Sequence, residues 1–146
     1  MNYKTMACIG LACLLATPVW AKNVRTQQSI EAGLGATWAS RARGDVKLYF
    51  GAKHPGFAKK IQEVSVKGRG SVGLTEGETA LGCHAAFISA ITRFQRLAQK
   101  LDGDAVIQIE SQHGDSTLKS ATTYYCGVGN SRTEVKLTGV LVQTKR

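Results

Sequence analysis

The chain has 146 residues, and its 19 Lys and Arg residues against 10 Asp and Glu residues give a formal net charge of +9. This length suits one domain with a single core, and the positive charge favours polyanionic partners through long-range attraction and counterion release. The glycine-rich stretches lack the following Lys-Ser/Thr of a phosphate-cradling loop, so an NTPase is excluded and no nucleotide is expected as a partner.

Residues 1–21 have the pattern of a secretory signal peptide: the single charged residue Lys4, an apolar run, and the sequence Val-Trp-Ala before Lys22. We therefore expect cleavage near Ala21 and a periplasmic or secreted protein with a net charge of +8. Acylation at Cys13 is a less favoured alternative, because it leaves a very short apolar region.

Residues 22–44 are polar, and Gly33 and Gly35 interrupt any longer helix, so we expect a flexible N-terminal arm with one helical turn near residues 29–32. The β-forming residues 46–50 predict a first strand, and residues 57–67 predict a second strand. The glycine-containing stretch at residues 67–71 is expected to be a flexible exit from this second strand.

The clearest predicted element is a long amphipathic helix. Thr75 and Glu78 fit a capping box at its start. Its apolar face recurs at helical spacing and its opposite face is basic near the C-terminal end. The apolar positions are Ala80, Phe87, Ile91, Phe94, Ala98 and Leu101.

The helix ends at residues 101–104, a strand is expected at residues 105–111, and residues 124–128 and 134–142 are further extended segments. We summarise the element order as β-β-α-β-β. It predicts an α+β domain over residues 45–146, in which one long amphipathic helix packs on a small, mostly antiparallel sheet.

Cys83 and Cys126 are the cysteines left after signal cleavage, so export predicts a disulfide between them. Cys83 lies near the helix start, and the end of the helix is about 27 Å away. The two Cα atoms must approach within about 7 Å. Residues 112–122 must then form a protruding excursion, with residues 134–142 pairing back along the strand at 105–111.

An alternative to the disulfide is a thiol hydrolase, in which Cys83 at the helix start is the nucleophile and His113 the base. No local nucleophile signature surrounds Cys83, so we favour a protein without catalytic residues. His54, His84 and His113 match no compact metal-ligand spacing, and neither a metal nor another cofactor is expected.

The basic residues suggest a binding surface for an anion or a partner protein, although a purely solubilising charge is an equal alternative. The partner would be an envelope protein or an anionic envelope component, with peripheral membrane contact possible. Nucleic acid is not favoured, because no aromatic ladder accompanies the cations. The candidate contact residues are Lys67, Arg69, Arg93, Arg96 and Lys100.

Several short motifs occur in order: KLYFG at 47–51, CHAAF at 83–87, GDAVI at 103–107, YCG at 125–127 and LTGV at 137–140. They resemble a family of small exported proteobacterial proteins that often carry the label "excinuclease ATPase subunit". More distantly, the pattern is similar to RcsF and YbjQ-like domains. The resemblance implies an α+β domain used for protein contacts, and it brings no established catalytic residues. Our leading hypothesis is thus a non-enzymatic exported binding domain.

Overall fold

The computed structural model describes residues 23–36, 39–42 and 44–144, so the expected signal peptide lies outside the described residues. The elements in chain order are β1 (Val24–Ser29), α1 (Ile30–Leu34), the short 3-10 helix η1 (Ala39–Arg41), β2 (Lys47–Phe50), β3 (Phe57–Ser71), α2 (Glu76–Lys100), β4 (Ala105–His113), β5 (Ser116–Leu118), β6 (Thr123–Val128) and β7 (Arg132–Thr144). Within this part of the chain, no helix has the length and apolarity needed to cross a membrane.

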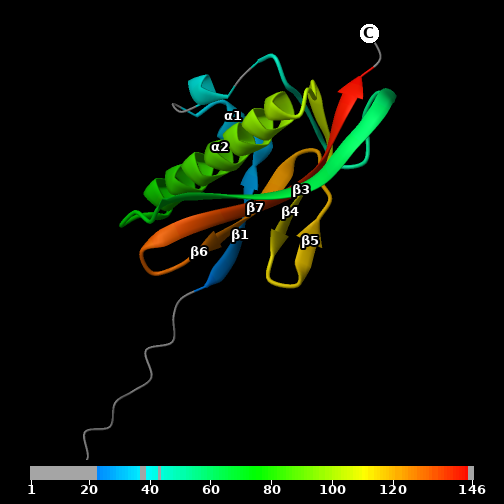
Figure 1. The fold of residues 1–146 in the computed structure, drawn as a ribbon. Coiled ribbons are helices and arrows are strands. Elements are labelled where there is room, and N and C mark those ends of the chain that lie inside the picture. Colours follow the sequence, from blue (N-terminus) through cyan, green and yellow to red (C-terminus); the bar gives the residue numbers. More distant parts are fainter. Residues whose placement is uncertain (1–22, 37–38, 43, 145–146) are drawn as a thin grey trace, which may run out of the picture.

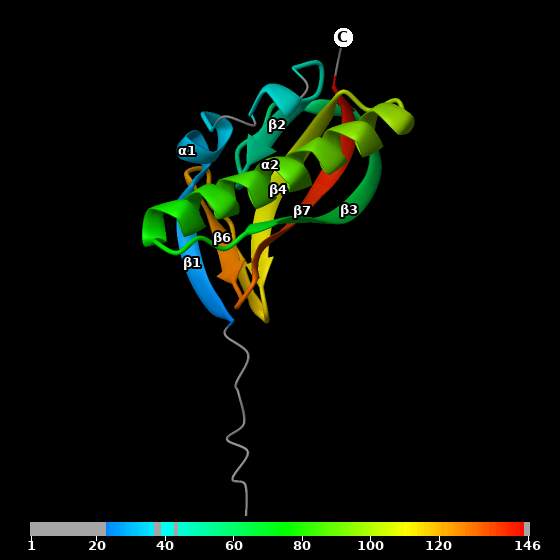
Figure 2. The same ribbon diagram turned by 90° about the vertical axis from the view of Figure 1, so that its left-hand side faces the viewer.

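The predicted α+β class with one long helix is confirmed, but the sheet is larger than expected and differs in strand order. It has seven strands, with the order β1-β6-β7-β4-β2, while β3 pairs with β7 and β5 pairs with β4. The β2–β4 pair is parallel and the other pairs are antiparallel. Helix α2 lies across one face of this curved sheet (Figures 1 and 2).

The structure corrects the expectation of a flexible arm at residues 22–44, because much of this segment is regular structure. β1 pairs with β6 from Val24 opposite Val128 to Ser29 opposite Thr123. The Ser29 side chain caps α1 by accepting a hydrogen bond from the Ala32 backbone nitrogen at 3.2 Å. The alternation that indicates a strand is weak here, since β1 is an edge strand that is only partly buried.

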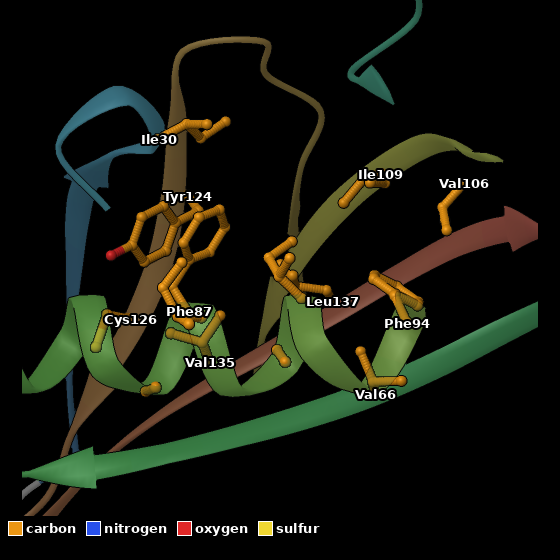
Figure 3. Packing of buried hydrophobic residues seen from close by; sticks show 14 of the residues in the cluster. Ile30, Val66, Phe87, Phe94, Val106, Ile109, Tyr124, Cys126, Val135 and Leu137 are labelled. Atoms are coloured by element: carbon orange, nitrogen blue, oxygen red, sulfur yellow. The ribbon is translucent and has the colours of Figure 1, made fainter. Parts of the chain in front are cut away.

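Helix α2 begins and ends as the sequence predicts. The Thr75 hydroxyl accepts from the Glu78 backbone nitrogen at 3.2 Å, and the Glu78 carboxylate accepts from the Thr75 nitrogen at 3.1 Å, which completes the capping box. Its Phe87 and Phe94 are fully buried. Figure 3 shows Phe87 against Tyr124 of β6, with ring centroids 4.2 Å apart in a stacked arrangement.

The structure also corrects the expectation of a flexible segment at residues 67–71. This segment is the C-terminal end of β3, and it packs directly against α2. A Cβ atom added at Gly68 would lie 1.8 Å from the Ala86 carbonyl oxygen, and one at Gly70 would lie 2.0 Å from the Gly82 carbonyl oxygen. Glycine is therefore needed at both positions so that the strand can approach the helix backbone.

The predicted disulfide is confirmed: the Cys83 and Cys126 sulfurs are 2.04 Å apart and their Cα atoms 5.9 Å apart. β7 pairs back along β4, as the disulfide required. The excursion at residues 112–122 is less irregular than expected, because β5 pairs with the end of β4 inside it.

Candidate anion-binding site

The structure places Cys83 and His113 in different surroundings. Cys83 is fully buried and bonded to Cys126, so its sulfur is not a thiolate nucleophile in this state. The His113 imidazole contacts Gly127 on the sheet face opposite α2, with its Nε2 atom 3.0 Å from the Asn23 side-chain oxygen. The geometry therefore gives no support to a thiol hydrolase built on this pair.

The other two histidines lie in separate contacts. Nδ1 of His54 is 2.8 Å from the Pro55 carbonyl oxygen, and Nδ1 of His84 is 2.9 Å from the Tyr124 hydroxyl. Burial lowers the pKa of His84 and raises that of Tyr124 above its ordinary value. His84 and Tyr124 thus form a polar contact at the edge of the core, between α2 and β6.

Three of the five predicted contact residues meet in one groove across the exposed side of α2. Arg69 reaches it from β3, Arg93 and Arg96 belong to the helix, and Arg41 joins them from η1. The groove encloses about 330 Å³. We call it the arginine groove.

The local structure explains how these four residues come to line one groove. On α2, Ala85 and Ser89 have small side chains that face away from the core, so the helix surface is recessed between the arginines. On β3, Gly68 faces the helix backbone, so the alternation of side chains turns Arg69, like Lys67, toward the opposite face of the sheet, where its Nε atom lies 3.6 Å from the Glu134 carboxylate. The groove therefore has a floor formed by Ala85, Ile88, Ser89 and Thr92 and a rim formed by Arg41, Arg93 and Arg96, with Arg69 of β3 at its edge.

None of the described residues that line the arginine groove carries a carboxylate. Arginine remains protonated at any physiological pH and presents planar donors that match phosphate and carboxylate oxygens in pairs. The arrangement is therefore suited to an anionic group, although the charge of Arg69 is shared with the Glu134 carboxylate, which lies outside this lining.

Lys67 and Lys100, the remaining predicted residues, do not line this groove. Lys67 forms an ion pair with Glu134 at 3.2 Å, and Arg69 approaches the same carboxylate at 3.6 Å. Partial burial raises the pKa of Glu134, but the hydrogen bonds and charges of Lys67 and Arg69 together hold that pKa below its ordinary value. Glu134 thus stays ionised and positions both cations on β3.

Sequence reasoning missed Arg41. It lies in the segment expected to be a flexible arm, and the only sequence signal available there was its charge. The contact between η1 and α2, which brings Arg41 to the groove, joins residues far apart in the chain.

Comparisons with protein-family models, curated proteins and solved structures found no match.

Proposed function

We propose that this protein is an exported, non-enzymatic binding domain whose arginine groove binds an anionic group of a cell-envelope component. The single observation that carries the proposal is the convergence of Arg41, Arg93 and Arg96 from two elements, with Arg69 of a third beside them, around a groove whose described lining residues include no carboxylate. Export is supported by the signal-peptide pattern of residues 1–21.

Binding would depend on a rim that is held in place before the ligand arrives. Arg69 is positioned by its contact with Glu134, and its strand is packed against the α2 backbone at Gly68 and Gly70. The disulfide ties the start of α2 to β6. A rigid support reduces the ordering cost of binding, although the long arginine side chains must still lose rotamer freedom.

The test compares two triple variants that each remove three positive charges. R41Q/R93Q/R96Q changes exposed groove residues, whereas K47Q/K53Q/K59Q changes exposed lysines outside the groove. Binding of inorganic tripolyphosphate and of purified lipopolysaccharide is measured by calorimetry at several salt concentrations. We expect the arginine variant to bind about tenfold more weakly or worse, because a hydrogen bond to a charged group contributes about 1.5–3 kcal/mol.

The lysine variant should bind nearly as the unmodified protein does, and the melting temperature of both variants should be almost unchanged, since the altered side chains lie outside the core. The salt dependence of binding should fall chiefly in the arginine variant. Equal losses in the two variants would mean that only overall charge matters. Unchanged binding in the arginine variant would discard the groove and leave a specific protein partner as the surviving hypothesis.

A further inference from the structure

A second, larger groove lies on the sheet face opposite α2. It encloses about 660 Å³, and its lining includes the cationic side chains of Lys67, Arg132 and Lys136 together with the neutral polar side chains of Asn23, Gln112 and His113. We call it the sheet groove. Its lining mixes these cations and neutral polar groups with the Glu134 carboxylate, in contrast to the arginine rim on the helix side.

The register of the strands establishes which face carries the sheet groove. Lys136 of β7 is paired with Lys67 of β3 on one side and with Gln112 of β4 on the other. The preceding and following residues on these strands, such as Val66 and Leu137, belong to the core beneath α2. Because side chains alternate along a strand, Lys67, Gln112 and Lys136 point away from the helix.

The two grooves meet at the C-terminal half of β3. Arg69 lines the arginine groove and Lys67, two residues earlier on the same strand, lines the sheet groove. Both cations contact the Glu134 carboxylate, at 3.6 Å and 3.2 Å respectively. A band of positive side chains, with the Glu134 carboxylate between Lys67 and Arg69, therefore runs from the exposed side of α2, around β3, to the opposite face of the sheet.

This geometry discriminates between kinds of anionic ligand. A flat membrane surface can contact one of two opposite faces at a time, whereas a flexible chain can pass around β3 and occupy both grooves. The amide and imidazole groups of Gln112 and His113 can exchange hydrogen bonds with hydroxyl groups, which a simple phosphate chain lacks. The sheet groove therefore favours a ligand that carries hydroxyls as well as negative charges.

We propose that the ligand is an acidic polysaccharide that occupies both grooves at once, with its acidic groups on the arginine rim and its sugar hydroxyls among the polar groups of the sheet groove. This inference rests on the proposed function and names the ligand class for that site. Its central consequence is that affinity depends on chain length, because engaging the second groove becomes an intramolecular event once the chain spans both.

The test uses galacturonate oligomers, from the disaccharide to long chains, at fixed salt. Long chains should bind about 100-fold more tightly than the disaccharide, at the lower end of the gain that linked sites provide. The variant R132Q/K136Q, altered only in the sheet groove, should lose this gain and keep the affinity for tripolyphosphate, which is small enough for the arginine groove alone. K47Q/K53Q should keep the whole gain, because both lysines lie outside the two grooves.

Two comparison ligands complete the design. A long polyphosphate with the same number of charges should bind more weakly than the galacturonate chain, and vesicles of phosphatidylglycerol should show no response to R132Q/K136Q. Equal affinity for short and long galacturonate would overturn the two-groove inference, and equally tight polyphosphate would overturn the choice of a polysaccharide. If tripolyphosphate binding is insensitive to R41Q/R93Q/R96Q, it is the proposed function itself that fails.

Discussion

Gly68→Ala should destabilise the domain strongly, since the added methyl group has no space. Its position would be 1.8 Å from the Ala86 carbonyl oxygen and 2.6 Å from the Ala90 nitrogen, and both are backbone atoms that cannot rotate away. Reaching an ordinary contact of 3.4 Å requires β3 and α2 to separate by roughly 1.6 Å. That movement also breaks the neighbouring close contact between Gly70 and Gly82.

Overpacking a core generally costs about 1–3 kcal/mol, and an obstruction by backbone belongs at the upper end, so we expect a loss of about 3 kcal/mol. With a urea slope of about 2 kcal/mol per molar, the midpoint of unfolding should fall by about 1.5 M without a change in slope. Gly56→Ala is the matched control, since an added Cβ there meets nothing within 4 Å. If the two variants unfold within about 0.5 kcal/mol of each other, the close packing of β3 on α2 is wrong.

Three further predictions concern covalent, polar and ionisable groups. Cys126→Ser should cost about 4 kcal/mol of unfolding free energy, because the bond to Cys83 closes a loop across a sequence separation of 43, and reduction of the unmodified protein should cause a comparable loss in urea unfolding. Thr133→Val should stabilise the domain by about 1 kcal/mol in the same assay, since the Thr133 hydroxyl is buried with no hydrogen-bond partner in the described structure; a loss of stability would show that the hydroxyl has one. Desolvation lowers the pKa of His84 below 6.5, so the unfolded chain takes up the proton more readily and stability should fall as the pH drops from about 7 to about 5; His84→Gln should make this profile shallower, and an unchanged slope would contradict the assignment.

The sequence predicted the helix and the disulfide well because both depend on strong local or covalent signals. The capping box at Thr75 and the repeat of apolar residues through Phe87 and Phe94 specify α2 without knowledge of its neighbours. The pairing of Cys83 with Cys126 followed from their number and from the expected compartment. The distance along the helix from Cys83 to the C-terminal end of α2 then implied, correctly, that β7 pairs back along β4.

The elements that the sequence did not reveal depend on distant contacts. β1 is polar and becomes a strand through pairing with β6, about 100 residues further along the chain. Gly68 and Gly70 are ordinary signals of a flexible loop, and only the position of the helix backbone beside them gives them another role. The arginine groove was partly foreseen through Arg69, Arg93 and Arg96, but the partner Arg41 could be placed only by tertiary structure.

The position of β7 has a consequence for the timing of folding. This strand pairs with β3, β4 and β6, yet among the described strands it is the most C-terminal. A growing chain that has not yet reached Arg132 therefore lacks the strand that joins these three into one sheet, and the core beneath α2 lacks Val135 and Leu137. Most of the pairing must wait until nearly the whole domain has been synthesised, which keeps the nascent chain unfolded for longer than a domain built from local contacts. A chain in that state is the form that can be threaded through a narrow translocation channel.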